Sequence, residues 1–254
     1  MGTYDFSGKT ALITGAGSGI GRRIAIVLAA QGADVVLAGR QLSALQETAA
    51  DIEHRGGNGL AVTADVSSED SVETLLEQAI NHTGQLDIAV NAAGVLRDGP
   101  IDDFSVEDFQ TVFATNTLGT WLCLKHEIRA MKQQKHGGVI INIGSTAGYH
   151  LTRPGAAAYS ASKAAVTVLT KTAALEAIDS GIRINSISPG PVDTAMSYRV
   201  GEDRDARNAR IEASNPSRRV ASVDEIAHTV SWLCSDAAAY LVGHDLVVDG
   251  GVSL

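Results

Sequence analysis

Short runs of consecutive apolar residues recur along the whole chain, and they constrain the fold more than any other feature. They lie at Lys9–Thr14, Val35–Ala38, Leu60–Thr63, Leu86–Val90, Val139–Ile143, Ile182–Ile187 and Leu246–Val248. Longer segments with helical spacing separate them, as in Val72, Leu75 and Ala79. Continuous apolar strands indicate burial on both faces, which a parallel sheet covered by helices provides. The pattern predicts an α/β fold with a doubly wound, mostly parallel seven-stranded sheet flanked by helices.

Composition narrows the classes of function. The chain has 254 residues, 44% of them hydrophobic, and α/β folds of this length commonly form one domain with a large core. We therefore expect a single domain over residues 1–254. A net charge of −9 provides no basic footprint for nucleic acid or an anionic membrane. Neither is an expected partner.

The sequence also bears on the location of the protein in the cell and on metal binding. No apolar run approaches the roughly 20 residues that span a bilayer, and the first residues lack a basic segment followed by an apolar one. We expect a cytoplasmic protein. Cys123 and Cys234 lie far apart, without a Cys-x-x-Cys pair or a nearby cluster of histidines. We therefore expect buried free thiols and no metal site.

A glycine-rich turn follows the first apolar run and precedes a segment with helical spacing. It reads Thr14-Gly-Ala-Gly-Ser-Gly-Ile-Gly21. Glycines let the main chain approach a pyrophosphate closely, and a helix N-terminus offers unpaired N–H groups and partial positive charge to that anion. The spacing departs from G-x-G-x-x-G, and similar turns occur without a nucleotide. The strand and helix on either side nevertheless favour a dinucleotide site.

Polar and glycine-rich segments follow the other predicted strands too. Ligands of doubly wound sheets bind beyond the carboxyl ends of the strands. The segments at those ends are 14–21, 39–40, 65–66, 91–94, 144–145 and 188–194. One longer stretch, residues 194–219, is rich in arginine, glycine, asparagine and serine. We expect it to be a mobile lid over a substrate.

Tyr159 and Lys163 are spaced so that they share one face of a helix. A free phenol loses its proton near pH 10, and a cation a few ångströms away lowers that pKa by roughly 1–3 units. The pair is thus a candidate proton donor and acceptor. Taken alone, the same spacing is also what any helix rich in alanine and serine can contain.

Together, these motifs resemble the short-chain dehydrogenase/reductase family over essentially the whole chain. The resemblance rests on residues 14–21, Asn91-Ala-Ala-Gly94, Asn116, Ser145, Tyr159-x-x-x-Lys163 and Pro189-Gly-Pro-Val-Asp-Thr194. It implies a Rossmann-type sheet, a nicotinamide cofactor, and interconversion of alcohols and ketones.

The chain departs from the family pattern in two places. Ala92 stands where the family usually has a second asparagine, but it keeps the turn small. The interval from Ser145 to Tyr159 is one residue longer than is common in the family, which makes Thr146 an alternative to Ser145. Ser145 is favoured because it follows Asn142-Ile-Gly144, as the family's serine does.

The resemblance implies a role for each residue of the site. Tyr159 would exchange a proton with the substrate oxygen, and Ser145 would hydrogen-bond the same oxygen. Lys163 would support the tyrosinate and hold the nicotinamide ribose, while Asn116 would bind a water that relays protons to Lys163. The implied cofactor-binding residues are Gly15, Ser18, Gly19, Ile20, Gly21, Arg40, Asp65, Val66, Asn91, Ala92, Gly94, Tyr159, Lys163, Pro189, Gly190, Val192 and Thr194.

The end of the second predicted strand bears on the choice of cofactor. An NAD site places a carboxylate there for the ribose hydroxyls, whereas an NADP site places a cation against the 2′-phosphate. Gly39 occupies the usual acidic position and Arg40 follows, which favours NADP(H) over NAD(H). Ser18 stands where many NADP-preferring members carry a basic residue, and Arg40 can equally cap the strand.

Two classes of function follow: an NAD(P)(H)-dependent alcohol dehydrogenase or ketone reductase, and a dinucleotide-sensing regulator on the same fold. The complete Asn116, Ser145, Tyr159 and Lys163 set favours the enzyme, with a small carbonyl or alcohol compound as substrate. Segments 161–165 and 240–254 resemble those that the family uses for contacts in homotetramers or homodimers. No partner is evident for any of the histidines.

Overall fold

The computed structural model describes residues 4–134 and 136–254. Its strands are β1 (Thr10–Thr14), β2 (Asp34–Gly39), β3 (Asn58–Thr63), β4 (Ile88–Asn91), β5 (Gly138–Ile143), β6 (Ile182–Pro189) and β7 (Asp245–Val248). They form one sheet in the order β3-β2-β1-β4-β5-β6-β7, and every pairing is parallel. The predicted α/β fold with a seven-stranded, doubly wound sheet is confirmed.

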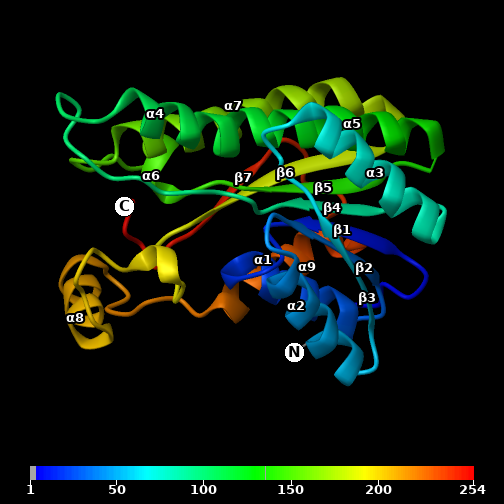
Figure 1. The fold of residues 1–254 in the computed structure, drawn as a ribbon, viewed down its shortest axis with the longest axis horizontal. Helices are drawn as coiled ribbons and strands as arrows, with labels where there is room; N and C mark the ends of the chain where they lie inside the picture. Colours follow the sequence, from blue (N-terminus) through cyan, green and yellow to red (C-terminus); the bar gives the residue numbers. More distant parts are fainter. Residues whose placement is uncertain (1–3, 135) are drawn as a thin grey trace.

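Helices cover both faces of this sheet (Figure 1). One face carries α1 (Gly19–Ala30), α2 (Leu42–His54) and α9 (Val223–Cys234), and the other carries α3 (Glu69–Thr83), α4 (Val106–Phe113), α5 (Gly119–Gln134) and α7 (Ala157–Ala177). Two further helices, α6 (Thr146–Tyr149) and α8 (Arg204–Ser214), lie beyond the carboxyl ends of the strands, at the left of Figure 1.

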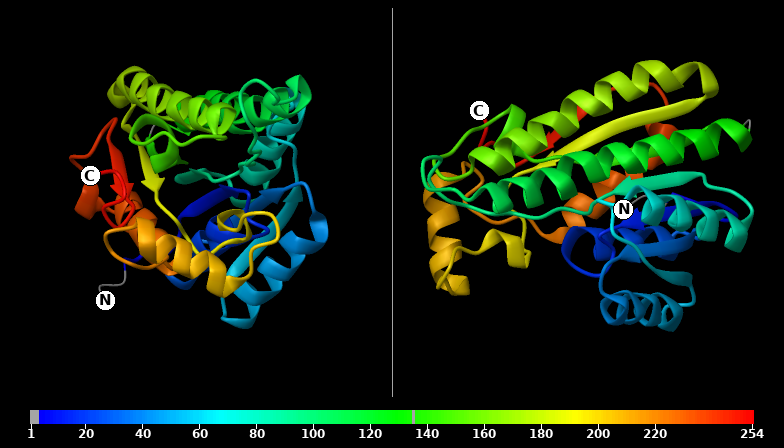
Figure 2. Two further views of the ribbon diagram at one scale, coloured as in Figure 1. Left: turned by 90° about the vertical axis from the view of Figure 1, so that its left-hand side faces the viewer. Right: turned by 45° about the horizontal axis from the view of Figure 1, so that its top comes forward.

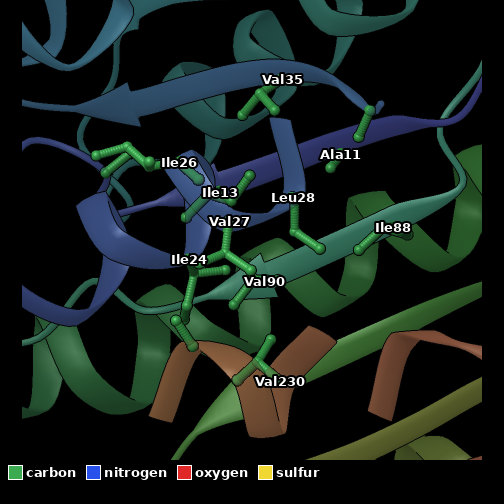
Figure 3. Packing of buried hydrophobic residues seen from close by; sticks show 14 of the residues in the cluster. Ala11, Ile13, Ile24, Ile26, Val27, Leu28, Val35, Ile88, Val90 and Val230 are labelled. Atoms are coloured by element: carbon green, nitrogen blue, oxygen red, sulfur yellow. The ribbon is translucent and has the colours of Figure 1, made fainter. Parts of the chain in front are cut away.

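Alternate residues of each strand enter different hydrophobic cores. Ala11 and Ile13 of β1 pack on the α1 and α9 side (Figure 3), whereas Leu12 between them packs with residues of α3 and α5. All three side chains are 1% exposed or less. Burial on both faces explains why the strands are continuously apolar.

Local signals set the ends of the helices. The Ser68 hydroxyl accepts from Ser71 N at the start of α3, and Gly84 ends it with φ at +83°. A capping box of Ser222 and Glu225 begins α9. These are standard N-cap and C-cap arrangements.

A π-helical turn, η1 (Ala114–Leu118), joins α4 to α5 and carries Asn116. Asn116 therefore lies at an irregular turn between two regular helices, of a kind often found at functional sites. In the described part of the chain, no helix is both long enough and apolar enough to cross a membrane.

Candidate active site

Glycines pack the first strand-to-helix turn tightly against the turn after β4. A Cβ on Gly15 would lie 2.9 Å from the backbone of Ala92 and Ala93, and one on Gly21 would lie 2.4 Å from Gly15 O. Thr14 Oγ1 accepts from Ala92 N at 3.1 Å. The two loops are therefore held together, and only glycine fits at these points of closest approach.

The N-terminus of α1 is open toward solvent. Ser18 is the N-cap, is exposed, and makes no side-chain capping hydrogen bond. Gly19 has φ at +52°, and a Cβ built on it would lie 3.3 Å from Thr194 Cγ2. The loop after β6 thus reaches over the glycine turn, so free N–H groups, a free hydroxyl and Thr194 border one position suited to a pyrophosphate.

Three of the other predicted cofactor residues follow β2 and β3. Arg40 is exposed. Asp65 accepts from Ser67 N and Ser67 Oγ at 2.9 and 2.7 Å. Its pKa is lowered first by the side-chain and backbone hydrogen bonds of Ser67 and, to a smaller extent, by the charge of Arg40. Val66 is 7% exposed and lies close to Gly119, where a Cβ would be 2.7 Å from Val66 Cγ2.

Asn91 ends β4, and its side chain points into the core. Its Nδ2 donates to Glu127 Oε2 and to Asn142 Oδ1, both at 3.0 Å. Any contribution of this amide to a cofactor site therefore works through the placement of the following turn. That turn ends at Gly94, where a Cβ would lie 3.4 Å from both Asn116 Oδ1 and Lys163 Nζ.

Asn116 is fully buried and its amide is engaged by protein groups. Its Oδ1 accepts from Val95 N at 2.8 Å, while Nδ2 donates to Val95 O and to Ser162 Oγ at 3.0 Å. Ser162 Oγ in turn donates to Tyr159 O at 2.7 Å. Asn116 thus links the Gly94 turn to α7. Ser162 was missed in the sequence, although its place beside Lys163 put it on the inner side of that helix.

Ser145 and Thr146 occupy different environments. Ser145 is partly exposed, caps α6, and accepts from Ala147 N at 3.2 Å. Thr146 is 2% exposed and its hydroxyl donates to Ser188 O at 3.5 Å. Thr146 thus points toward β6 rather than toward Tyr159, which supports Ser145 as the candidate.

Burial shifts the pKa values of both Tyr159 and Lys163. It raises the pKa of Tyr159 above its ordinary value of 10, and hydrogen bonding to Ser145 offsets this only in part. Burial also lowers the pKa of Lys163 to about 8. The lowering predicted for Tyr159 from its spacing to Lys163 is therefore not what the structure gives, because desolvation disfavours both charged forms.

The loop after β6 positions the remaining predicted residues. A Cβ on Gly190 would lie 2.7 Å from Asp249 Cα, so Pro189 and Gly190 lie against the end of β7. Val192 is 4% exposed and forms a β-bridge with Ala221.

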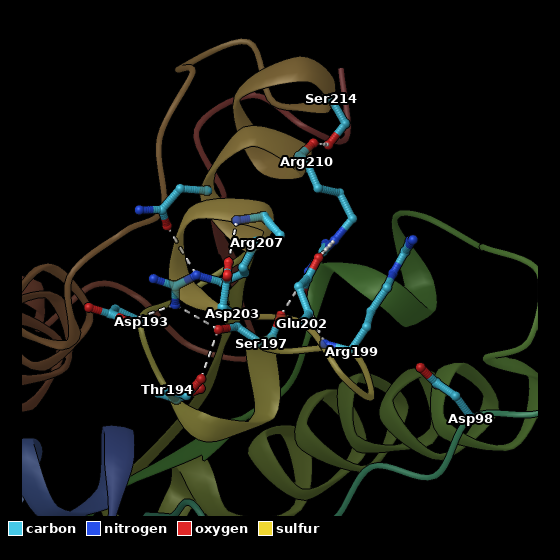
Figure 4. A network of polar contacts seen from close by, with 12 residues as sticks. Asp98, Asp193, Thr194, Ser197, Arg199, Glu202, Asp203, Arg207, Arg210 and Ser214 are labelled. Carbon is cyan, nitrogen blue, oxygen red and sulfur yellow. Dashed lines mark hydrogen bonds and ion pairs between the residues drawn. The ribbon is translucent and has the colours of Figure 1, made fainter.

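Residues 194–219 have a structure of their own (Figure 4). Arg207 of α8 is 1% exposed, donates to Asp193 Oδ1 at 2.6 Å, and lies 4.5 Å from the centre of the Tyr198 ring. Arg210 makes two 2.7 Å hydrogen bonds to Glu202. Figure 2 shows α8 set apart from the helices that cover the sheet. Three arginines of this segment, Arg204, Arg207 and Arg210, thus form ion pairs with Asp193 or Glu202.

Neither the burial of Glu127 nor the contact between His150 and Asp245 was predicted from the sequence. Glu127 of α5 is fully buried, and burial raises its pKa to about 7 despite the hydrogen bond from Asn91. His150 Nε2 lies 2.7 Å from Asp245 Oδ2, across 95 positions of the sequence. Nothing local marks either partner. The structure also buries both cysteines as free thiols. Among residues 4–134 and 136–254, no cluster of His, Cys, Asp or Glu is suited to a metal ion.

Known proteins resemble this chain over nearly its full length. The family model described as Enoyl-(Acyl carrier protein) reductase matches residues 15–253. The short chain dehydrogenase/reductase astE of Aspergillus oryzae is 40% identical over 99% of this chain and 97% of its own. The 3beta-hydroxysteroid dehydrogenase 1 of Eggerthella lenta is 39% identical over 98% of this chain and 95% of its own.

A solved structure agrees with these sequence matches. The short-chain type dehydrogenase/reductase from Mycobacterium marinum superimposes with a TM-score of 0.93 and 37% identity, covering 99% of this chain and 98% of that one. The sheet order and the glycine turn agree with these matches, which cover nearly the whole chain. The chain belongs to the short-chain dehydrogenase/reductase family of oxidoreductases.

Proposed function

We propose that this protein transfers a hydride between NADP(H) and a carbonyl or secondary alcohol substrate, with Tyr159 as general acid and base. One observation carries the proposal: the turn at Gly94 approaches Asn116 Oδ1 and Lys163 Nζ equally closely, at 3.4 Å from a built Cβ. Tyr159 lies one helical turn before Lys163 and shares hydrogen bonding with Ser145. The candidate catalytic residues therefore lie near one another, beyond the carboxyl ends of the strands.

The chain fits a dinucleotide. The glycine turn, the uncapped Ser18 and Thr194 supply space and donors for a pyrophosphate. Gly39 offers no carboxylate for ribose hydroxyls, and the exposed Arg40 next to it suits a 2′-phosphate. Asp65, Val66, Asn91, Ala92 and the loop from Pro189 complete the proposed site. When bound, the nicotinamide supplies or accepts the hydride.

The residues of the chain handle the proton and the charge. Tyr159 gives its proton to the carbonyl oxygen in reduction, while the Ser145 hydroxyl donates to the same oxygen as negative charge develops. Lys163 spends one of its three N–H groups on Ile143 O, at 2.7 Å. Two N–H groups remain for ribose hydroxyls. Asn116 holds the turn beside Lys163, in the place proposed for a proton-relaying water.

The raised pKa of Tyr159 bears on the direction of the reaction. Because burial raises the pKa of Tyr159, the phenol that donates a proton is favoured over the phenolate. Alcohol oxidation needs the phenolate instead, which becomes populated only as the pH rises. We therefore propose that ketone reduction is the faster direction at pH 7 and that oxidation gains rate toward alkaline pH.

Turnover assays test the activity. NADPH would be mixed with ketones, acyl-thioesters, sugars and oxo-steroids, and NADP⁺ with the matching alcohols, because the substrate-facing segments do not select one class. Wild type should turn over at least one substrate. Tyr159→Phe should lose about 10²- to 10⁴-fold in kcat while its dinucleotide Kd stays unchanged. Tight binding without turnover by wild type would favour a dinucleotide sensor, and a loss below tenfold in Tyr159→Phe would remove the phenol as the acid.

Arg40→Asp tests the cofactor. It should weaken NADPH binding far more than NADH binding, because only NADPH carries the 2′-phosphate. Arg129→Asp makes the same change of charge at an exposed position of α5 and should leave both affinities unchanged. Equal effects of Arg40→Asp on the two cofactors would remove Arg40 from the phosphate site.

We also propose that the chain is a single cytoplasmic domain whose residues 194–219 cover the substrate, and that it forms a homotetramer or homodimer. Leu118 and Trp121 on η1 and α5, and Val168 and Leu175 on α7, are 43–79% exposed, which is unusual for large apolar side chains grouped on two packed helices. Tyr240 and Leu254, in the C-terminal segment, are also exposed apolar side chains. Light scattering on the eluting protein measures the assembly, and a monomer at micromolar concentration would contradict it.

A further inference from the structure

Asp245 is a buried carboxylate behind the candidate active site. It opens β7, and its side chain is 5% exposed. Oδ1 accepts from Ser186 Oγ at 2.7 Å and from Ser188 Oγ at 2.9 Å. Oδ2 accepts from Thr167 Oγ1 at 3.3 Å and lies 2.7 Å from His150 Nε2. Because a carboxylate only accepts hydrogen bonds, Nε2 carries the proton and donates it.

The donors to Asp245 come from the segments that carry the proposed chemistry. Ser188 precedes the Pro189 loop, and Thr167 lies one helical turn after Lys163 on α7. His150 ends the turn that Ser145 caps. Burying a carboxylate costs free energy unless donors surround it. The Asp245 carboxylate receives its donors from β6, from α7 and from the turn that Ser145 caps. These hydrogen bonds therefore also fix the positions of the three segments relative to one another.

The Ser145 turn needs such an anchor. Inside α6, Ala147 and Gly148 have ψ angles of 90° and −104°, so the segment is not a regular helix. Its backbone hydrogen bonds run from His150 N to Thr146 O, from Leu151 N to Thr146 O at 2.9 Å and from Gly148 N to Leu151 O at 2.8 Å. A turn with such irregular backbone angles depends for its local stability on contacts outside itself. The contact with Asp245 ties its far end to the sheet.

We propose that His150 and Asp245 form a positioning pair: the hydrogen bond from His150 Nε2 holds the 145–150 turn against β7 and thereby fixes the Ser145 hydroxyl at the substrate oxygen. The proposal rests on the proposed function, since Ser145 acts there on the developing charge. Because this stabilisation matters most in the transition state, loosening the turn should lower kcat more than it raises KM.

The test uses His150→Ala, His150→Gln, Asp245→Asn and the double variant His150→Ala/Asp245→Asn. His150→Ala should lower kcat about 10- to 100-fold, the order of loss expected from a small misplacement, with dinucleotide Kd unchanged. His150→Gln keeps a side-chain N–H and should recover most of that loss. The double variant should lose no more than Asp245→Asn alone, because His150 acts only through its hydrogen bond to Asp245. His82→Ala changes an exposed histidine of α3 and is the matched control.

The possible outcomes separate positioning from other roles. A kcat of His150→Ala equal to wild type, a change in KM alone, or a loss that glutamine does not recover would each overturn the proposal. Amide hydrogen exchange of residues 145–151 supplies a readout without turnover: exchange should accelerate in His150→Ala and return in His150→Gln. That pattern in a protein without any turnover would refute the proposed function and leave the anchoring intact, whereas unchanged exchange would refute the anchoring.

Discussion

Helix α7 and segment 194–219 each bury a cation, but the surroundings of the two cations differ. Arg207 of segment 194–219, 1% exposed, pairs with Asp193 and stacks on Tyr198. Lys163 of α7, 5% exposed, donates to a backbone carbonyl, and burial lowers its pKa to about 8. A carboxylate partner offsets the cost of burying a cation, whereas a buried cation without such a partner carries an uncompensated cost. The cost at Lys163 is the mark of a group held ready for a ligand.

Removing the cation of α7 should have the largest effect. Lys163→Met should reduce kcat/KM by at least about 10²-fold, because support for the proton transfer is lost together with ribose binding. The free energy of unfolding should change little, since the desolvation cost disappears along with one hydrogen bond. Steady-state kinetics and urea unfolding measure the two effects. Lys132→Met, at an exposed position of α5, is the control, and a loss below tenfold at Lys163 would undo the contrast.

Glu127 extends the comparison to a buried acid without a cation partner. Its pKa is raised from 4.5 to about 7, so the folded state binds the proton more tightly than the unfolded state. The contribution of the Glu127 proton to the free energy of unfolding is therefore full below pH 4.5 and is lost as the pH rises through 7. Glu127→Gln removes this dependence. Its free energy of unfolding should exceed that of wild type by up to about 3 kcal/mol at pH 8 and match it more closely at pH 5.

Urea unfolding of wild type and Glu127→Gln at several pH values measures that difference, and other titrating groups cancel in the comparison. A difference that is constant with pH would show that Glu127 is not protonated in the folded state.

Breaking the paired cation should have a smaller and more local effect. Arg207→Met should destabilise segment 194–219 by about 1–3 kcal/mol, less than for a fully buried pair, because Asp193 is 44% exposed. We expect a raised KM, a kcat within tenfold of wild type, and faster proteolysis within 194–219. A kcat loss as large as that of Lys163→Met would mean that the two cations have similar roles.

Arg204→Met should have the smallest effect. This arginine lies on the same helix, 3.7 Å from the same carboxylate, but is 73% exposed. Exposed ion pairs contribute about 0–1 kcal/mol, so KM and proteolysis should stay close to wild type. An effect equal to that of Arg207→Met would show that burial is not what separates the two regions.

Much of the site was predictable because its signals are local. The glycine spacing from Gly15 to Gly21 describes one turn, and Tyr159 and Lys163 describe one face of one helix. The order of apolar runs predicted the sheet, since strands buried on both faces require helices on both sides. The link from Asn116 to Ser162 and the inward direction of Asn91 were not predictable, because each depends on which distant residue lies opposite.

The sequence by itself determined the parallel sheet, the dinucleotide-type turn and the set of residues that could move a proton, because period, spacing and residue chemistry act over short stretches of chain. Only the tertiary structure decided the pKa shifts of Tyr159, Lys163 and Glu127, since desolvation depends on what the fold packs around each group. It also decided that His150 meets Asp245, 95 positions away. No local pattern in the sequence predicts this contact. It forms because β7 pairs with β6 at the end of the sheet and places Asp245 beside the turn that ends at His150.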